Sequence, residues 1–175
     1  MTSIETATFG AGCFWGVEHA FRRKFGSKLK RAEVGYAGGD AANPNYKQVC
    51  TGTTGHAEVL QVDYNPAELS FEELVDFFYR SHDPTTLNRQ GGDKGTQYRS
   101  SILFHNEEQR VQAQAFTDRV RPKFGSAGIS TIIEPVGQFW KAEDYHQLYL
   151  DHNPEGYQCP THFERSWEKI EASNQ

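Results

Sequence analysis

Hydrophobic side chains recur along the chain at two spacings, which predict where strands and helices lie. Alternating or β-branched runs predict strands over residues 4–9, 29–36, 58–64, 98–104 and 131–136. Apolar residues three and four positions apart predict helices over 13–25, 70–80, 106–121 and 142–150. The predicted order is therefore β-α-β-β-α-β-α-β-α.

Capping residues mark the starts of two of these helices. Ser70 and Glu73 form a capping box at the second helix. Asn106 is the expected cap of the third, whose inward face is expected to carry Val111, Ala115 and Phe116. Both helices are therefore expected to pack one face against a sheet.

A helix after the first strand and another after the third are typical of the split β-α-β arrangement. We therefore expect an α+β fold, in which helices pack on a mixed, mostly antiparallel sheet around a ferredoxin-like split β-α-β core. Residues 1–175 should form one domain, with an irregular C-terminal tail over 151–175. Two long loops, over 40–55 and 81–97, are expected to be functional because loops of such length are uncommon in compact domains.

Composition narrows the class of protein. The formal net charge of -5 argues against nucleic acid as a partner. No apolar window reaches the roughly 18 residues that a membrane helix needs. Residues 1–5 carry neither a basic region nor an apolar signal stretch, so we expect a cytoplasmic protein.

Three cysteines, at positions 13, 50 and 159, form a poor structural disulfide framework. Their odd number fits a redox pair with one bystander. The sequence has no C-x-x-C, no H-E-x-x-H and no paired histidines at ligand spacing, so we expect no metal site. The scattered histidines are expected at the surface or as caps: His56, His82, His105, His146, His152 and His162.

Cys13 lies in a glycine-rich turn between a predicted strand and a predicted helix. A helix N-terminus favours a thiolate because of the backbone dipole. Phe14 and Trp15 place an apolar surface beside the sulfur, which suggests chemistry on a small apolar group. The alternative is an inert, buried cysteine in a turn.

Glu58 begins a predicted strand and shares one face with Leu60, Val62 and Tyr64. A carboxyl on an apolar face loses hydration, which raises its pKa and can make it a proton donor at neutral pH. A solvated strand end is the alternative interpretation.

Other polar groups lie in the two long loops and in the tail. Tyr46 and Tyr98, which lies near Asp93, could donate hydrogen bonds to an oxygen that gains negative charge, with packing as the alternative for each. Cys159 lies in the tail, where a flexible segment could carry it to a distant nucleophile; a leftover surface thiol is the alternative. Cys50 is interpreted as a small buried residue.

Five motifs occur in one order: Gly12–Cys13–Phe14–Trp15–Gly16, Gly35–Tyr36–Ala37–Gly38–Gly39, Asn43–Pro44–Asn45–Tyr46, Gly55–His56–Ala57–Glu58 and Gly95–Thr96–Gln97–Tyr98–Arg99. On these motifs, over roughly residues 6–160, the chain closely resembles the A-type peptide methionine sulfoxide reductases.

The resemblance implies a role for each matching residue. Cys13 would be the nucleophile, Glu58 the proton donor and Cys159 the resolving cysteine. The remaining matches are Tyr46 and Tyr98, which would bind the sulfoxide oxygen, Asp93 in the same polar network, and Phe14 and Trp15 around the substrate methyl group. Many relatives carry two tail cysteines, whereas this chain has one, so a second relay inside the chain is not expected.

The resemblance also implies a reaction. The Cys13 thiolate would reduce the S-epimer of methionine sulfoxide, free or in proteins, and become a sulfenic acid. A Cys13–Cys159 disulfide would follow, and thioredoxin would reduce it in a cycle that repairs oxidised proteins. No cofactor or metal is implied, and we expect a monomer.

Two other functions would use some of the same residues. A thiol peroxidase also needs a reactive and a resolving cysteine, but it does not explain the aromatic wall, and turnover of peroxide would identify it. A non-catalytic metal- or peptide-binding module is the second, and the isolated cysteines argue against its metal-binding form.

Overall fold

The computed structural model describes residues 3–174, so the N-terminal stretch 1–5 lies partly outside it. The strands are β1 Glu5–Ala11, β2 Leu29–Ala37, β3 Ala57–Tyr64, β4 Arg89–Gln90, β5 Asp93–Lys94, β6 Ser100–Phe104, β7 Ile132–Pro135 and β8 Trp140–Lys141. The α-helices are α1 Phe14–Phe25, α2 Tyr46–Cys50, α3 Phe71–Arg80, α4 Glu107–Val120, α5 Tyr149–His152 and α6 Trp167–Ser173. Short 3₁₀ helices span Gly26–Lys28, Thr96–Tyr98, Arg121–Ala127 and Asp144–His146.

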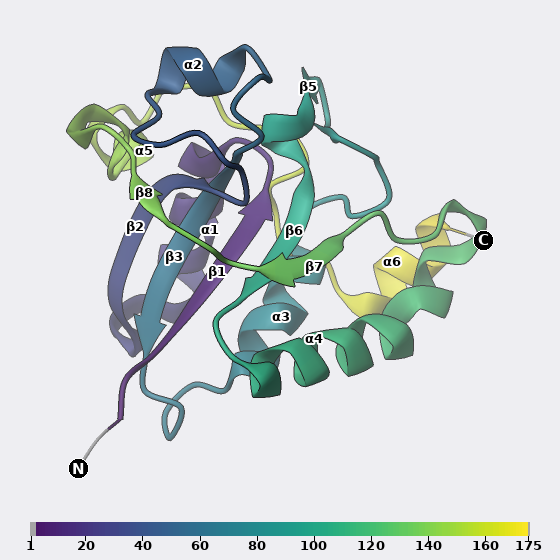
Figure 1. Ribbon diagram of the computed structural model, residues 1–175. Coiled ribbons are helices and arrows are strands. Elements are labelled where there is room, and N and C mark those ends of the chain that lie inside the picture. Colours follow the sequence, from purple (N-terminus) through teal and green to yellow (C-terminus); the bar gives the residue numbers. More distant parts are fainter. Residues whose placement is uncertain (1–2, 175) are drawn as a thin grey trace.

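The main sheet has the strand order β7-β6-β1-β3-β2-β8 (Figure 1). Its pairings are antiparallel except β6 with β7. β1 and β2 both run antiparallel to β3, which lies between them, and α1 connects them. This is the predicted split β-α-β unit, and the α+β fold is confirmed.

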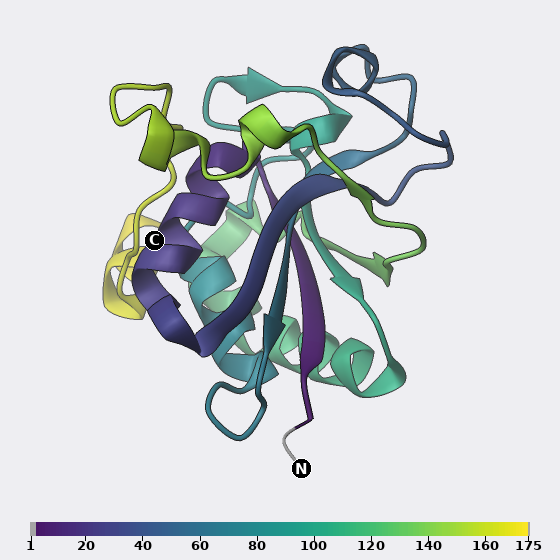
Figure 2. The ribbon, with the colours of Figure 1, turned by 90° about the vertical axis from the view of Figure 1, so that its left-hand side faces the viewer.

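α1 and α3 lie on the same side of the sheet (Figures 1 and 2). They enclose an aromatic core in which Phe9 of β1 packs against Phe21 of α1 and Phe78 of α3 at ring separations of 5.6 and 5.3 Å. The predicted capping box of Ser70 and Glu73 is present at the start of α3. The core therefore fixes the end of β1 against the start of α1, where Cys13 lies.

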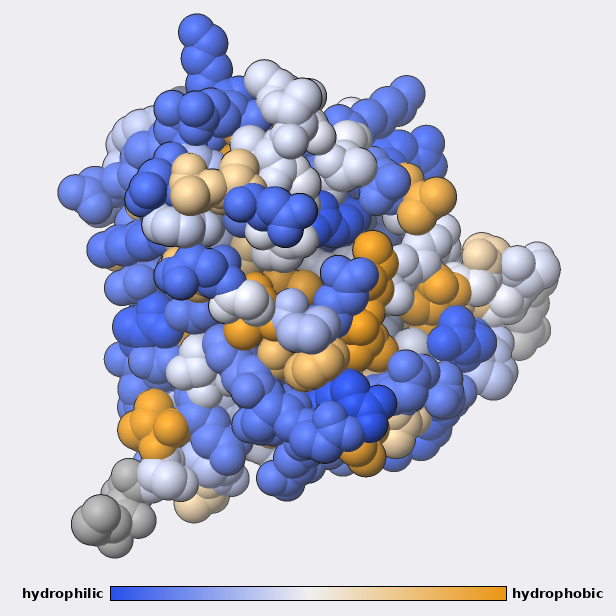
Figure 3. All heavy atoms as spheres, viewed as in Figure 1, coloured by the Kyte–Doolittle hydropathy of each residue, from blue (hydrophilic) through white to orange (hydrophobic). Residues whose placement is uncertain are grey.

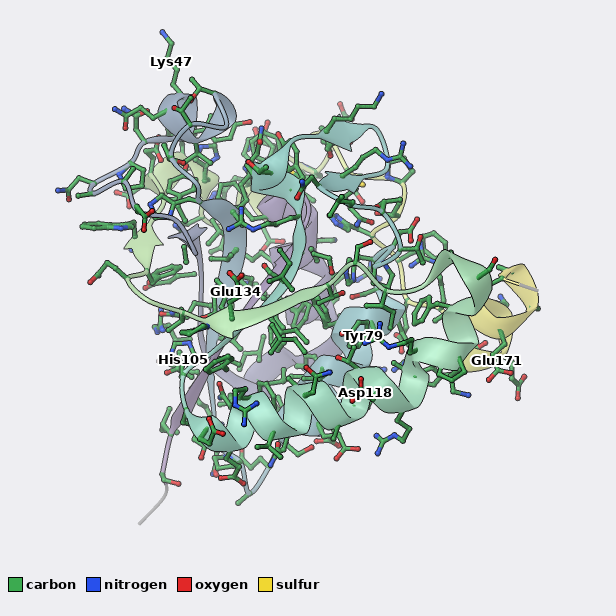
Figure 4. The ribbon with its side chains drawn as sticks, turned by 45° about the vertical axis from the view of Figure 1, so that its right-hand side comes forward. Lys47, Tyr79, His105, Asp118, Glu134 and Glu171 are labelled. Carbon is green, nitrogen blue, oxygen red and sulfur yellow. The ribbon has the colours of Figure 1, made fainter. Side chains whose placement is uncertain are left out.

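The inward face of α4 was predicted only in part. Asn106 caps α4 and Phe116 is buried, but Val111 and Ala115 are exposed. The stripe instead starts at Gln109, a polar residue that is buried because its amide bonds the backbone of Thr6 and His105. From α3, Tyr79 reaches α4 and pairs with Thr117 (Figure 4).

Among the helices of residues 3–174, none covers the middle of the opposite face of the sheet (Figure 1). A small cluster there consists of buried residues of β2, β3 and β6, with Val136 and Phe139 packed against it. Figure 3 shows hydrophobic residues gathered near the middle of this face, within a largely hydrophilic surface.

The helix predicted over Ala142–Leu150 is wrong. The segment begins just after β8 and contains the 3₁₀ helix and the first two residues of α5, and Leu148 between them has a left-handed backbone with φ 55°. The Gln147 amide bonds both the N–H and the C=O of Val34. These bonds from a polar side chain to β2 replace the intrahelical bonds that apolar spacing had suggested.

The two long loops and the tail contain elements that were not predicted. α2 lies within 40–55, the β4–β5 hairpin lies within 81–97, and a 3₁₀ helix begins at the end of that second loop. The tail is irregular over 153–166, as expected, but it ends in α6, which packs Ile170 into the core. Within residues 3–174, no helix is long and apolar enough to cross a bilayer.

Candidate active site

Cys13 is the N-cap of α1 and follows β1 by one residue. The chain turns there through Gly12, whose φ of 94° favours glycine. A Cβ at Gly12 would also lie 2.6 Å from Cγ of Gln90, so a side chain would displace the β4–β5 hairpin. The thiol is 8% exposed.

The electrostatic environment of Cys13 differs from the one predicted. Burial and the nearby Glu58 raise the pKa of the thiol, against the backbone N–H groups of Trp15 and Gly16, which lower it. The helix N-terminus therefore does not by itself produce a thiolate, because the loss of hydration outweighs the backbone N–H groups. In the resting site the thiol holds its proton.

Glu58 is 1% exposed, and its carboxyl lies at the start of α1. Oε1 accepts a hydrogen bond of 3.1 Å from the Phe14 N–H, whereas Oε2 is buried with no partner among residues 3–174. Burial raises the pKa of Glu58 to about 8, although the Phe14 N–H opposes this rise. The carboxyl is therefore mostly protonated at neutral pH, and its unpaired oxygen can carry the proton.

Tyr46 and Tyr98 approach the same carboxyl from the two long loops. Tyr46 is the first residue of α2, and Tyr98 ends the 3₁₀ helix before β6. The pKa of each hydroxyl is raised by burial and then by Glu58, so both remain protonated donors. Lys47, the next residue of α2, points away from the protein (Figure 4).

Glu143 positions Tyr46 and was missed at the sequence level. Its carboxylate accepts from the Tyr46 N–H at 3.1 Å and from the Tyr36 hydroxyl at 2.9 Å. These bonds lower the pKa of Glu143, so it is charged at the start of α2. Glu143 lies in the segment 142–150, for which only a helix was predicted, and the sequence carried no signal of its contacts with Tyr36 and Tyr46.

Aromatic residues wall the site beside the sulfur. Phe14 is buried against Tyr36, at a ring separation of 5.8 Å. Trp15 is half-buried and stacks on Tyr149 at 3.7 Å, with 13° between the ring planes. The surface beside Cys13 is therefore apolar, and α5 supports it.

Asp93 connects the hairpin to the tail. It lies in β5, and its Oδ2 accepts a bond of 2.9 Å from the Tyr157 hydroxyl. Its charge raises the pKa of Cys13 and of Glu58, so Asp93 belongs to the same polar neighbourhood. Tyr157, like Glu143, was not recognised as a site residue.

Cys159 is packed, contrary to the flexible tail that was predicted. It is 3% exposed, with Sγ 3.6 Å from the Gln90 carbonyl and 3.1 Å from Thr161 Oγ1. Among the described residues all three cysteines are free thiols, so Cys159 and Cys13 are not joined. Cys50 is exposed at the end of α2, which contradicts the prediction of a small buried residue.

His162 holds the tail against the turn that contains Cys13. Its Nε2 lies 2.6 Å from the Ala11 carbonyl, and the ring covers Gly16. Glu164 pairs with Lys24 and Arg80 further along the tail. The expectation that the histidines lie on the surface or serve as caps is wrong for His56 and His146, which are buried within the fold. The buried His82 does serve as a cap, because its Nδ1 bonds the Phe78 carbonyl in the last turn of α3.

Replacing Gly16 with alanine should loosen the contact between His162 and the turn at Cys13, because the new Cβ would overlap the His162 ring. An added carbon in a packed contact costs about 1–3 kcal/mol. We expect alkylation of Cys159 to become about tenfold faster, measured by mass spectrometry with the exposed Cys50 as the internal reference.

Gly92→Ala is the matched control, because a Cβ at Gly92 would meet no atom of the described residues within 4 Å. It should leave Cys159 as protected as in the wild type. An unchanged alkylation rate in Gly16→Ala would show that His162 does not hold the tail in place.

The site thus places three kinds of group around a buried thiol: a protonated carboxyl with a free oxygen, two tyrosine hydroxyls and an aromatic wall. A second thiol, that of Cys159, lies on the tail. The arrangement can polarise an oxygen attached to a small apolar group and then oxidise the thiol that attacks it.

The chain matches the family model described as "Peptide methionine sulfoxide reductase" over residues 5–175. The peptide methionine sulfoxide reductase of Saccharomyces cerevisiae is 48% identical over 164 residues, which cover 90% of this chain and 89% of that protein.

Two solved structures of a yeast protein are similar to this fold. Mxr1 from Saccharomyces cerevisiae in reduced form has a TM-score of 0.90 at 46% identity, with 93% of both chains covered. Mxr1 in complex with Trx2 has a TM-score of 0.66 at 32% identity, covering 93% of this chain and 91% of that one.

Proposed function

Because the chain belongs to the peptide methionine sulfoxide reductase family and is an oxidoreductase, we propose that it reduces methionine S-sulfoxide through Cys13. The substrate is the free amino acid or the same residue in oxidised proteins, which the enzyme repairs. Cys159 resolves the oxidised Cys13, and thioredoxin supplies the electrons.

The observation that carries this proposal is the unpaired, buried Oε2 of Glu58 beside the thiol. A carboxyl that keeps its proton at neutral pH can donate it to an oxygen that becomes negative. The hydroxyls of Tyr46 and Tyr98 supply further donors to the same oxygen. A thiol peroxidase would have no use for the wall made by Phe14 and Trp15, whereas a methyl sulfoxide would fill it.

In the first step the Cys13 sulfur attacks the sulfoxide sulfur and forms a transient sulfur–sulfur bond. Glu58 gives its proton to the oxygen and regains one as the thiol proton is released. The sulfur–sulfur bond and the sulfur–oxygen bond of the substrate then break, and the oxygen ends on Cys13 as S–OH. The substrate sulfur is reduced by two electrons, Cys13 is oxidised by two, and methionine leaves.

In the second step the Cys159 thiol attacks the Cys13 sulfenic acid, forms a disulfide and releases water. Cys159 is packed against Gln90 in the resting protein, so the tail has to leave this contact for the bond to form. A thioredoxin dithiol then exchanges with the disulfide and restores both thiols. The complex of the related Mxr1 with Trx2 supports this partner.

Separate assays with the two sulfur epimers of methionine sulfoxide test the proposed substrate. The purified protein with thioredoxin should consume the S-epimer and leave the R-epimer. Faster turnover of hydrogen peroxide than of either sulfoxide would replace the proposal with a thiol peroxidase.

Cys159→Ser should separate the two halves of the cycle. The variant should still reduce one equivalent of sulfoxide, because Cys13 and its donors are untouched, and then stall with thioredoxin as the only reductant. A burst of methionine equal to the enzyme concentration, with Cys13 trapped as sulfenic acid, would be the signature.

Cys50→Ser carries the same exchange at an exposed thiol and is the matched control, which should keep cycling. Full steady-state turnover of Cys159→Ser with thioredoxin would exclude Cys159 as the resolving residue. Cys50, or direct attack by thioredoxin on Cys13, would then be the route.

A further inference from the structure

His146 lies at the centre of the aromatic wall, although it was expected at the surface or as a cap. It is 1% exposed and belongs to the 3₁₀ helix between β8 and α5. Its ring lies 5.1 Å from that of Phe14, 5.7 Å from Trp15 and 4.6 Å from Tyr46. One imidazole thus contacts both pocket aromatics next to Cys13 and one of the two tyrosines.

The hydrogen bond between Trp15 and His146 determines which nitrogen of the neutral imidazole carries the proton. The Trp15 indole nitrogen lies 2.9 Å from His146 Nδ1. An indole N–H can only donate, so Nδ1 has to accept and the ring proton is on Nε2. Burial lowers the pKa of His146, in keeping with a neutral ring. Nε2 itself is buried and has no hydrogen-bond partner in the part of the chain that the structure describes, which costs free energy.

Two contacts together fix the Trp15 ring. The stack on Tyr149 sets the plane of the indole, but stacked rings can still turn within their planes. The bond from the indole N–H to His146 removes this freedom. The Tyr46 ring packs on the same imidazole, so the position of Tyr46 depends on His146 as well as on Glu143.

We propose that His146 is a positioning residue, which orients Trp15 for the substrate methyl group and supports Tyr46 beside the sulfoxide oxygen. The proposal rests on the function proposed above, in which Trp15 lines the methyl pocket. His146 acts through these two aromatics, and no contact of His146 with the substrate is required. It thereby couples the two halves of substrate recognition.

His146→Asn and His146→Leu form a matched pair. Asparagine and leucine have the same number of heavy side-chain atoms and nearly the same shape, so both leave a similar void. Asparagine can place an oxygen near the former Nδ1 and accept from the indole, whereas leucine cannot. Packing losses are thus common to both variants, and the hydrogen bond differs.

The first readout is the indole N–H signal of Trp15 in protein labelled with ¹⁵N-tryptophan. The sequence has three tryptophans, and Trp15→Phe assigns the signal. We expect the Trp15 signal to move upfield and exchange faster in His146→Leu, and to stay close to its wild-type position in His146→Asn. Trp167 donates to Asp76 and serves as the internal control, because its signal should not move.

The second readout is the kinetics with methionine sulfoxide. His146→Leu should lower kcat/KM by about tenfold, mainly through KM, as expected for the loss of about one hydrogen bond. His146→Asn should recover most of this loss. An unmoved Trp15 signal in His146→Leu, or equal KM values in the two variants, would overturn the proposal. If the wild type reduced no sulfoxide, the proposed function would fail, and the indole signals would still test the contact.

Discussion

Cys13→Ser should abolish sulfoxide reduction, with a loss of about 10⁴-fold or more. Serine keeps the size and the N-cap position at the start of α1, but a hydroxyl cannot form the sulfenic acid on which the proposed reaction depends. The residue is buried in a turn that positions it against Glu58, so no other group replaces it. The measurement is methionine formed per enzyme in a single turnover with the S-sulfoxide.

Circular dichroism should show an intact fold, since Gly12 and the core around α1 are unchanged. The same exchange at the exposed Cys50 should leave single-turnover reduction in place. If Cys13→Ser kept even about a tenth of wild-type turnover, another residue would have to be the nucleophile.

Glu58→Gln should slow the first chemical step by about 10²–10⁴-fold while the fold stays intact. Glutamine has the shape of glutamate and can still accept from the Phe14 N–H, but it has no proton to deliver. Single-turnover formation of the Cys13 sulfenic acid isolates this step from recycling by thioredoxin. An unchanged rate would remove Glu58 from the mechanism.

The pH dependence of the ratio between the two enzymes gives a second test of Glu58. Burial raises its pKa to about 8, so the carboxyl donates below this pH and becomes a carboxylate above it. The wild-type advantage over Glu58→Gln should therefore be greatest near neutral pH and shrink as the pH rises through about 8. A constant ratio between pH 6 and 10 would mean that protonated Glu58 is not the active form.

The sequence was sufficient where a pattern reports burial directly. Period-2 spacing placed Glu58 on the buried face with Leu60, and the structure finds it 1% exposed. The split β-α-β order and the Ser70 capping box were also predicted, because both depend on local residue types. These features bring Cys13 and Glu58 together.

Features that depend on distant partners could not be predicted. Glu143 and His146 lie in a segment whose spacing suggested an amphipathic helix, and their polar atoms meet Tyr36, Tyr46 and Trp15 across the fold. Burial of these polar side chains depends on the bonds they make, and one sequence does not show those bonds.

The state of the two thiols was also beyond the sequence. A helix N-terminus predicted a thiolate at Cys13, but the pKa depends more on how far the fold removes water. Cys159 lies in an irregular segment, yet it stays packed through its contacts with Gln90 and Thr161 and through the bond from His162 to the Ala11 carbonyl. A composition typical of loops predicts that a segment lacks helices and strands, but it does not predict that the segment is mobile.

Mass mapping of disulfides after one turnover tests the central claim most directly. The reduced protein is mixed with one equivalent of methionine S-sulfoxide without any reductant, quenched with an alkylating reagent and digested. The account predicts a peptide pair linked through Cys13 and Cys159, with Cys50 alkylated. A disulfide that contains Cys50, or three alkylated cysteines after methionine has formed, would contradict it.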